Sequence, residues 1–571
     1  MNETNGHRDP NAQVMLLLLL VVLVFAVPIR LVVPTPGEEF RRGLVCGMEL
    51  LFVVPYVLSL PRRQNLVVLS PMGGTLFVAW LIASVMSISL SPHWLPALAR
   101  QFEWICHILF AAAIWHFLRD NRTHVRWVII FAITGVMAAV LIVFRAYVSD
   151  MNSGGVAAHE FLPLFQHIRP YGHYVLAGLL LSQLWAADPK VGHARLLVPL
   201  LAVCVFWGAL IWTGGRAAVA SALIGLAIIV GLSAERRWIL AGVNTIGLSI
   251  GSVISAVTSA GNADLGWSGV FVRMAANNLN GFTMGRLQAW KVAYAHFKDQ
   301  PLFGFGPDAY MYVTPKIFDQ HPHNVVLQFL MDYGVVGAGL FGLLMSILVV
   351  TMLRRAVEKR VDLRPERVVA LSVLLAFSTN ALLSGTFYFA TPLMVTSLVL
   401  AIGLLPESYA VAPRRSGGFL AARTGFAGAA VTVTACFFAL YIAVLSNFLV
   451  GSVPAPGGSR AQLVRHLPMA THSMVLESWI RAWGNQDPQL ATEWAHWAHQ
   501  HSPDAYRFSS LEAKLLAEQG LYEAARNHAE LAIESASGMV RWTTRQSLQP
   551  IMDTAQTNSE QLLFEIPGEG R

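Results

Sequence analysis

About thirteen long apolar segments recur along the 571 residues and constrain the fold more than any other feature. A helix needs about 20 apolar residues to cross a bilayer. Charged residues make up 13% of the chain, about half the share found in soluble domains. We therefore predict an all-α polytopic membrane protein with about 12–13 transmembrane helices and few charges inside the spans. The segments lie near 14–34, 44–60, 66–89, 102–118, 126–147, 172–187, 195–212, 217–233, 237–258, 324–353, 368–385, 390–406 and 424–450.

Lysine and arginine concentrate in alternate connecting loops. With a cytoplasmic N-terminus, every cytoplasmic loop carries at least two of them, whereas 259–322 carries five in more than sixty residues. Cytoplasmic loops show this excess in membrane proteins generally. Orientation in the membrane therefore explains the formal net charge of +7, and nucleic acid is not an expected partner. The predicted topology places 148–171, 213–216, 259–322 and everything after about 450 on the outer side.

Four regions follow from this topology. Residues 1–13 form a cytoplasmic N-terminus, 14–450 the transmembrane domain, 451–560 an outer helical domain, and 561–571 a disordered tail. Within the third region, "SSLEAKLLAEQGLYEAARNHAELAIESA" has helical spacing around a glycine turn and resembles one tetratricopeptide-type helix pair. One pair cannot bury its own apolar face, so we expect further packing partners. A docking surface and a plain helical cap both remain open.

Metal-ligand patterns are scarce. The outer loops contain no DxD pair and no HExxH, and Mg²⁺ and Mn²⁺ enzymes normally need carboxylates. We predict neither a metal nor a cofactor. The cysteines lie inside apolar runs without metal-ligand spacing, which indicates small core residues. They are Cys46, Cys106, Cys204 and Cys436.

Two arginines are candidate anion-binding residues. Arg216 follows two glycines in "WTGGRAA" and opens an apolar helix. Backbone N–H groups at a helix N-terminus favour an anion, and Gly214 and Gly215 allow close approach of a ligand. Arg286 opens the helical pattern "GRLQAWKVAYAHF", ahead of the glycine-rich "LFGFGPDAY". Because carboxylates are scarce, arginine rather than metal is expected to neutralise any phosphate. A solvated or interfacial arginine is the simpler alternative at each position.

One histidine is a candidate general base. His323 and Asn324 directly precede a span in "HPHNVVLQFL". Histidine titrates near neutrality, so His323 is suited to removing a proton from a hydroxyl. Asn324 has the position of an N-cap for the following helix. His321 is either a supporting partner or an exposed residue.

Taken together, "WTGGRAA", then "MGRLQAWKVAYAHFKDQPLFGFGPDAY", then "HPHNVVLQFLMDYGVVG" resembles the O-antigen ligase superfamily. This superfamily includes WaaL-type ligases, Wzy-type polysaccharide polymerases and PglL-type protein O-oligosaccharyltransferases. The motifs cover roughly 165–345. The stretch "HIRPYGHY" matches the family poorly, so Arg169 and His173 are kept only as candidate substrate contacts, with His321 and Asn324.

The resemblance implies a metal-independent, inverting membrane glycosyltransferase of GT-C-like fold in the bacterial inner membrane, with its active site and C-terminal tail in the periplasm. The donor would be a glycan on undecaprenyl diphosphate, and the acceptor a hydroxyl of lipid A-core or of a periplasmic protein. Arg216 and Arg286 would bind the donor diphosphate, and His323 would activate the acceptor. The tail favours a protein acceptor.

Three alternatives remain open at this point. A Wzy-type polymerase would share the motifs. A lipid-linked glycan transporter would predict charges within the spans and internal repeats. A scaffold would use the membrane domain only to present the tail.

Overall fold

The computed structural model describes residues 10–31, 38–59, 70–92, 94–152, 162, 164–165, 167–260, 265–274, 286–310, 321–358, 363–406 and 505–535, with isolated residues and short stretches at 455–497 and 545–556. Every regular element within these residues is helical, which confirms the predicted all-α class. Twelve of the thirteen apolar segments lie on described helices; the last, 424–450, lies outside them.

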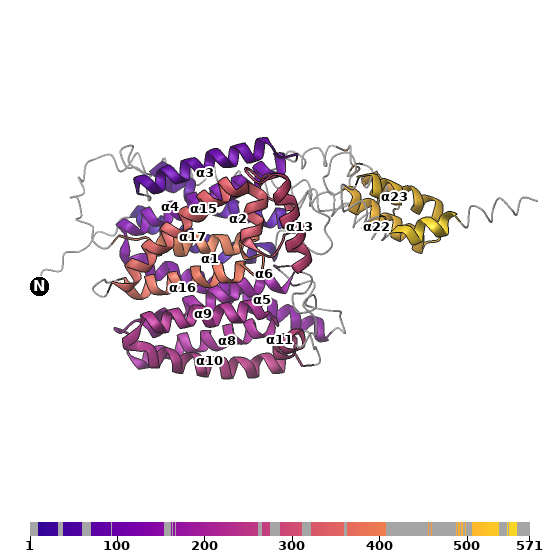
Figure 1. Ribbon diagram of the computed structural model, residues 1–571. Helices are drawn as coiled ribbons and strands as arrows, with labels where there is room; N and C mark the ends of the chain where they lie inside the picture. The colour runs from indigo at the N-terminus through magenta and orange to yellow at the C-terminus, as the bar shows by residue number, and fades with distance from the viewer. Residues whose placement is uncertain are drawn as a thin grey trace, which may run out of the picture.

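The membrane bundle consists of α1 (Pro10–Phe25), α2 (Glu38–Ser59), α3 (Pro71–Ser89), α4 (Trp94–Asp120), α5 (Val125–Asn152), α6 (Ile168–Leu181), α7 (Leu184–Ala187), α8 (Leu197–Trp212), α9 (Arg216–Leu232), α10 (Arg237–Thr258), α11 (Gly266–Met274), α13 (Arg286–Asp299), α15 (Val325–Val357), α16 (Arg364–Ala381) and α17 (Ala390–Gly403) (Figure 1). Short 3-10 helices are η1 (Pro28–Leu31), η2 (Arg122–His124), η3 (His193–Leu196), η4 (Ala234–Arg236) and η5 (Thr386–Tyr388).

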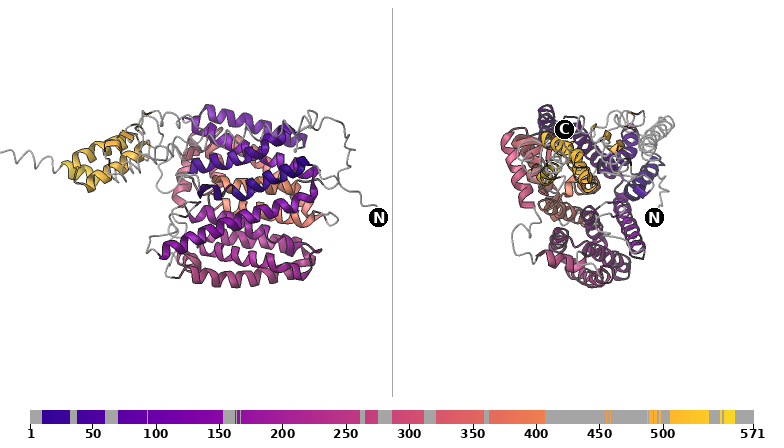
Figure 2. Two further views of the ribbon diagram at one scale, coloured as in Figure 1. Left: turned by 180° about the vertical axis from the view of Figure 1, so that it is seen from behind. Right: turned by 90° about the vertical axis from the view of Figure 1, so that its right-hand side faces the viewer.

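Seven helices in the described part of the chain are long and apolar enough to cross a membrane, and three more are shorter apolar helices. The protein is therefore a multi-pass membrane protein. The long helices run side by side, and α13 lies across one end of the bundle (Figures 1 and 2). Helices α6 and α17 bury nearly every side chain and therefore occupy the centre of the bundle.

Four charged residues gather inside the bundle. Arg42 on α2 and Arg100 and Glu103 on α4 are all buried, together with Asp308 from the loop after α13. Arg42 Nη1 lies 2.6 Å from Asp308 Oδ2, and Arg100 forms an ion pair with Glu103. Both guanidinium groups also lie over the ring of Tyr388. Residues from three separate segments thus neutralise each other inside the bundle.

Arginines of the loops predicted to be cytoplasmic bind the C-terminal ends of helices. Arg364 donates to the carbonyl of Leu232 at the end of α9, and Arg367 to that of Leu405 beyond α17, each over 2.7 Å. A helix C-terminus carries unpaired carbonyls and a partial negative charge, so cations are stabilising there. Further bonds of this kind join Arg122 to Pro406, Arg236 to Asp188, and Arg355 to Leu404.

Helix α15 is broken at Gly334, where φ is +63° and ψ is −173°. The break leaves carbonyls on its N-terminal side without their usual partners in the next turn. The loop after α13 supplies replacements, because Phe305 N donates to Met331 O and Gly306 N donates to Asp332 O, each over 2.9 Å. The glycine-rich stretch therefore acts as a structural partner of α15 rather than as a free turn.

The same loop also accepts hydrogen bonds from the C-terminal side of the break. Val335 N donates to Pro301 O over 2.8 Å, and Val336 N donates to Leu302 O over 3.2 Å. Four backbone bonds thus replace those that the break removes. They fix α13 relative to α15. Arg286 is the first residue of α13, and His323 lies just before the start of α15.

The C-terminal region contains α22 (Ala505–Glu518) and α23 (Tyr522–Ser535), which pack against each other across a turn at Gly520 with φ of +78°. Residues of a further helical stretch, including Leu548 and Ile551, pack into the same small core. The helix pair and its glycine turn agree with the sequence pattern. The tetratricopeptide resemblance, the docking role and the region boundaries stay predictions.

We predict that Gly334→Ala lowers the melting temperature of the purified protein. An added Cβ would lie 2.2 Å from the carbonyl oxygen of Leu302, and a left-handed backbone disfavours alanine by about 1–2 kcal/mol. Gly339→Ala is the matched control, because nothing lies within 4 Å of a Cβ there on the same helix. Equal melting temperatures for the two variants would contradict the proposed pairing of loop and helix.

Candidate active site

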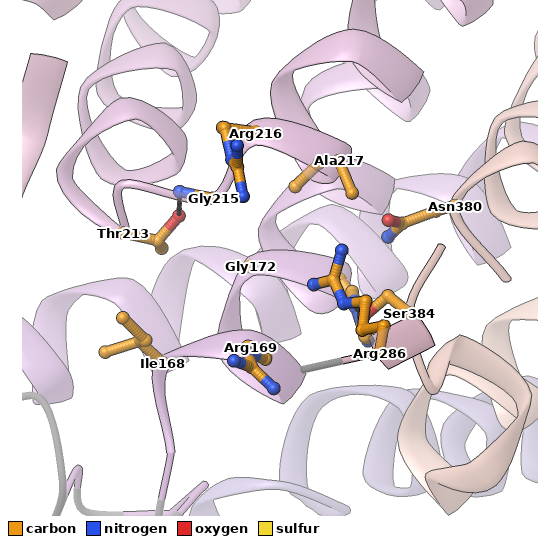
Figure 3. Close-up of a pocket in the computed structure, with 12 residues that line it drawn as sticks. Ile168, Arg169, Gly172, Thr213, Gly215, Arg216, Ala217, Arg286, Asn380 and Ser384 are labelled. Carbon is orange, nitrogen blue, oxygen red and sulfur yellow. Dashed lines mark hydrogen bonds between the residues drawn. The ribbon is translucent and has the colours of Figure 1, made fainter. Parts of the chain in front are cut away.

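A cavity opens at the end of the bundle near α13, where three predicted outer segments meet (Figure 3). Arg216, Arg286, Arg169 and His173 all lie on its wall. The structure thus brings together four of the seven site residues predicted from the sequence. The remaining lining residues are Ile168, Gly172, Thr213, Gly215, Ala217, Ala218, Asn380 and Ser384.

Each of the three cavity arginines stands in the first turn of a helix. Arg169 is the second residue of α6, Arg216 is the first residue of α9, and Arg286 is the first residue of α13. The N-terminus of a helix carries unpaired N–H groups and a partial positive charge. Three guanidinium groups and three positive helix ends therefore face one space, and no acidic side chain is among the described residues that line it. This arrangement favours a multiply charged anion.

The two glycines before Arg216 shape this wall. Gly214 has φ of +60°, a backbone conformation that allows the sharp turn between α8 and α9. Gly215 caps α9 and its N–H donates to Thr213 Oγ1 over 3.2 Å. The backbone of the turn consequently reaches the cavity directly, as the glycine pair predicted.

His323 adjoins the cavity through Arg169, because its Nε2 lies 3.4 Å from Arg169 Nη1. The imidazole is 2% exposed, and its backbone is left-handed with φ of +54°. Burial, together with the positive charges of Arg169 and Arg286, holds the pKa of His323 well below its usual range. The ring is therefore neutral near pH 7 and able to accept a proton.

Asn324 is the N-cap of α15, as the sequence predicted. Its Oδ1 accepts hydrogen bonds from Val326 N over 3.0 Å and from Leu327 N over 3.1 Å. This cap starts the helix directly after His323 and fixes the direction in which the chain leaves the site. The observed role of Asn324 is structural, and a substrate contact stays a prediction.

His321 is buried rather than exposed and supports His323. Its Nδ1 accepts a hydrogen bond from the backbone N–H of His323 over 3.2 Å, and its ring packs 4.6 Å from that of Tyr388. Gly385 makes room for this ring, because a Cβ there would lie 2.1 Å from His321 Cε1. A packed imidazole therefore holds the strained backbone of His323 in place.

Three polar residues of the cavity were missed from the sequence. Ser384 Oγ lies 3.1 Å from Nε2 of His173, and Thr213 and Asn380 complete the polar wall. The available signal was weak: Asn380 and Ser384 are polar residues inside the apolar segment 368–385. Only the packing of α16 against α6 and α9 brings them to the cavity.

One group outside the cavity has the composition of a metal site. Ligand atoms of Cys46, Glu49 and His107 lie within 4.8 Å of each other, and all three residues are buried between α2 and α4. The imidazole is already bound by carboxylates, with Nδ1 at 2.8 Å from Glu49 Oε1 and Nε2 at 3.6 Å from Glu103 Oε1. The cluster therefore extends the buried ion pairs between α2 and α4.

Residues 200–342 match the family model described as O-antigen ligase. The chain carries an O-antigen ligase family domain. This match supports membership of the O-antigen ligase superfamily, as the motifs indicated, and thus a membrane enzyme of ligase or polymerase type. The matched segment includes Arg216, Arg286 and His323, whereas Arg169 and His173 precede it. No curated protein matches the chain.

We predict that Arg169→Gln raises the pKa of His323. Removing a neighbouring positive charge makes the imidazolium less unfavourable, so the pKa should move up toward its usual range. The measurement is an NMR titration of the histidine Cε1–H signals of the protein in detergent micelles. Arg195→Gln is the control. This arginine is exposed and lies before the start of α8, whereas the other end of α8 reaches the cavity. An unchanged titration in Arg169→Gln would contradict the assigned electrostatic cause.

Proposed function

We propose that the protein is a membrane glycosyltransferase that moves a glycan from undecaprenyl diphosphate to a hydroxyl group at the periplasmic face of the bacterial inner membrane. The observation that carries this proposal is the cavity lined by Arg169, Arg216 and Arg286 and adjoined by the neutral imidazole of His323. Arginine binds phosphate oxygens through two parallel N–H bonds. A diphosphate carries the charge that such a cavity suits best.

Arg216 and Arg286 bind the diphosphate of the donor in this proposal, assisted by Arg169 and the N–H groups of α9. The same contacts stabilise the negative charge that appears on the diphosphate as it leaves. Because guanidinium groups supply this stabilisation, the reaction needs no metal to neutralise the leaving group.

His323 acts as the general base. It removes the proton from the acceptor hydroxyl while the oxygen forms a bond to the anomeric carbon, and the bond between that carbon and the diphosphate oxygen breaks. The products are a glycoside, undecaprenyl diphosphate and a protonated imidazole. Attack from the face opposite the diphosphate inverts the anomeric configuration.

Arg169 connects donor binding to the base. Its guanidinium contributes to the low pKa of His323, and a bound diphosphate offsets that positive charge. The imidazole consequently becomes a stronger base when the donor is present, which suits proton transfer near neutral pH.

The proposed acceptor is a hydroxyl of lipid A-core or of a periplasmic protein. A growing polysaccharide would use the same chemistry, so a Wzy-type polymerase is the alternative within the same family. The C-terminal helices support a protein acceptor to the extent that they serve as a docking surface. Loop arginines bound to helix C-termini at the opposite end of the bundle agree with a cytoplasmic position for that end.

We predict that His323→Ala abolishes transfer without preventing donor binding. Loss of a general base typically costs about 10²- to 10⁴-fold in rate. The assay uses the full-length ligase in nanodiscs, with an undecaprenyl-diphosphate-linked glycan and periplasmic acceptors, and follows both the new glycoside and donor binding. Full transfer by His323→Ala would rule out the proposed base.

For the arginines we predict that donor binding is lost together with transfer, in contrast to His323→Ala. Arg216→Gln and Arg286→Gln should weaken donor binding as well as transfer, because each loses a charge-assisted contact worth about 1.5–3 kcal/mol. Arg195→Gln serves as the control for loss of a positive charge away from the cavity. Wild-type donor affinity in both cavity variants would remove the diphosphate assignment.

A further inference from the structure

Tyr388 lies in a chain of contacts that connects the buried charges of the bundle to His323. Its side chain is 1% exposed, and its ring packs 4.6 Å from that of His321. The guanidinium groups of Arg42 and Arg100 lie over the same ring, at 4.2 Å and 5.6 Å from its centroid. Tyr388 therefore contacts both the buried arginines and the histidine that supports the proposed base.

The two arginines also bind the backbone of η5. Arg100 Nη2 donates to the carbonyl of Phe387 over 2.9 Å, and Arg42 Nη2 donates to that of Tyr388 over 3.2 Å. Each guanidinium is in turn paired with a buried carboxylate. One arginine can bind a carboxylate and a carbonyl at once, because its planar fork carries five N–H donors. The buried charges thus fix the position of η5.

This turn surrounds the ring of His321. Tyr388 N donates to Gly385 O over 2.9 Å and closes the turn. The ring of Tyr388 packs against the imidazole, and Gly385 contacts it as well, since a Cβ there would lie 2.1 Å from His321 Cε1. Residues 321–323 belong to no helix. The position of His321 consequently depends on packing against η5 rather than on a regular element of its own.

His323 needs such support because its backbone is strained. Its φ of +54° is uncommon for a residue that carries a Cβ. A conformation of this kind persists only where the surrounding structure determines it. One determining contact is the hydrogen bond of 3.2 Å from His323 N to His321 Nδ1. A shift of His321 would break this bond and let His323 relax to an ordinary backbone conformation, which would move its imidazole.

We propose that Tyr388 is a positioning residue for the general base and that Arg42 and Arg100 hold Tyr388 in place. This inference rests on the proposed function, in which His323 removes the proton from the acceptor hydroxyl. Tyr388 is not among the described residues that line the cavity, so it acts through the histidine pair. A displacement of about 1 Å at a reacting group can lower a rate by about 10²-fold. The donor-binding arginines belong to other segments, so donor binding does not depend on Tyr388.

The test combines Tyr388→Leu, which removes the ring, with Tyr388→Phe, which keeps it. The full-length protein in nanodiscs is assayed with lipid-linked glycan and acceptors extracted from the producing bacterium, and undecaprenyl diphosphate is the probe for donor binding. Tyr388→Leu should lower kcat about 10- to 100-fold and leave donor affinity unchanged. Tyr388→Phe should keep kcat near the wild-type value, because the ring still packs against His321.

Two further readouts distinguish positioning from a general loss of stability. In an NMR titration, Tyr388→Leu should raise the pKa of His323 toward its usual range, because burial is the main cause of its low value. In the His323→Ala background, Tyr388→Leu should cause no further loss of rate, since the base through which it acts is gone. Tyr56→Leu is the matched control and should change neither readout. It removes a buried ring, stacked 5.6 Å from that of Phe52, near the other end of α2.

Unchanged kcat in Tyr388→Leu, or an equal further loss in the His323→Ala background, overturns the positioning role and leaves His323 as the base. Full transfer by His323→Ala overturns the proposed function instead. If Tyr388→Leu does not fold, Arg42→Lys replaces it. Lysine keeps a positive charge beside Asp308, but its compact ammonium lacks the fork that also reaches the carbonyl of Tyr388. Arg42→Lys should lower kcat about 10-fold with donor affinity unchanged, and wild-type kcat in this variant would overturn the inference.

Discussion

The pairing between the broken helix α15 and the loop after α13 is the constraint on which the site depends. Gly334 interrupts α15, and four backbone hydrogen bonds with 301–306 replace those that the interruption removes. Because buried backbone groups need partners, the break and the loop require each other. Asp308, at the end of this loop, forms an ion pair with Arg42 on α2 and so joins the loop to the rest of the bundle. The helix that begins at Arg286 is held in position by this arrangement.

Arginine has opposite roles at the two ends of the bundle. At one end, Arg364 and Arg367 bind carbonyls at helix C-termini, where positive charge is favourable. At the other end, Arg169, Arg216 and Arg286 stand at helix N-termini, where the helix dipole opposes them. Positive charge therefore gathers around the cavity. This charge favours an anionic ligand, which agrees with the proposed binding of a diphosphate.

Much of the architecture could be predicted from local pattern. Apolar length identified the spans, the spacing around Arg286 identified α13, and Asn324 had the position of the cap that it forms. These features depend on neighbours in the sequence. Contacts between distant segments could not be found in this way. The ion pair of Arg42 with Asp308 joins residues 266 positions apart, and a single sequence carries no signal of that pairing.

The same difference between local features and contacts of distant segments applies to the candidate site. Residue type and helix position indicated Arg216, Arg286 and His323, because guanidinium and imidazole groups at helix starts have recognisable chemistry. Asn380 and Ser384 could not be identified from residue type, since a polar residue in a span is often satisfied by its own helix. Their place on the cavity wall depends on how α16 packs against α6 and α9.

Charges within the bundle bear on the choice between transfer and transport. A transport path needs charged groups that a moving substrate can reach in turn. Arg42, Arg100, Glu103 and Asp308 are buried and bound to one another, and none of them lines the cavity. Moving a charged headgroup past them would first have to break these pairs, which is costly in a low-dielectric interior. The cavity arginines instead gather at one end of the bundle, where a lipid diphosphate can bind, react and leave on the same face. The two sets of charges therefore favour a fixed site for group transfer over a relay across the membrane.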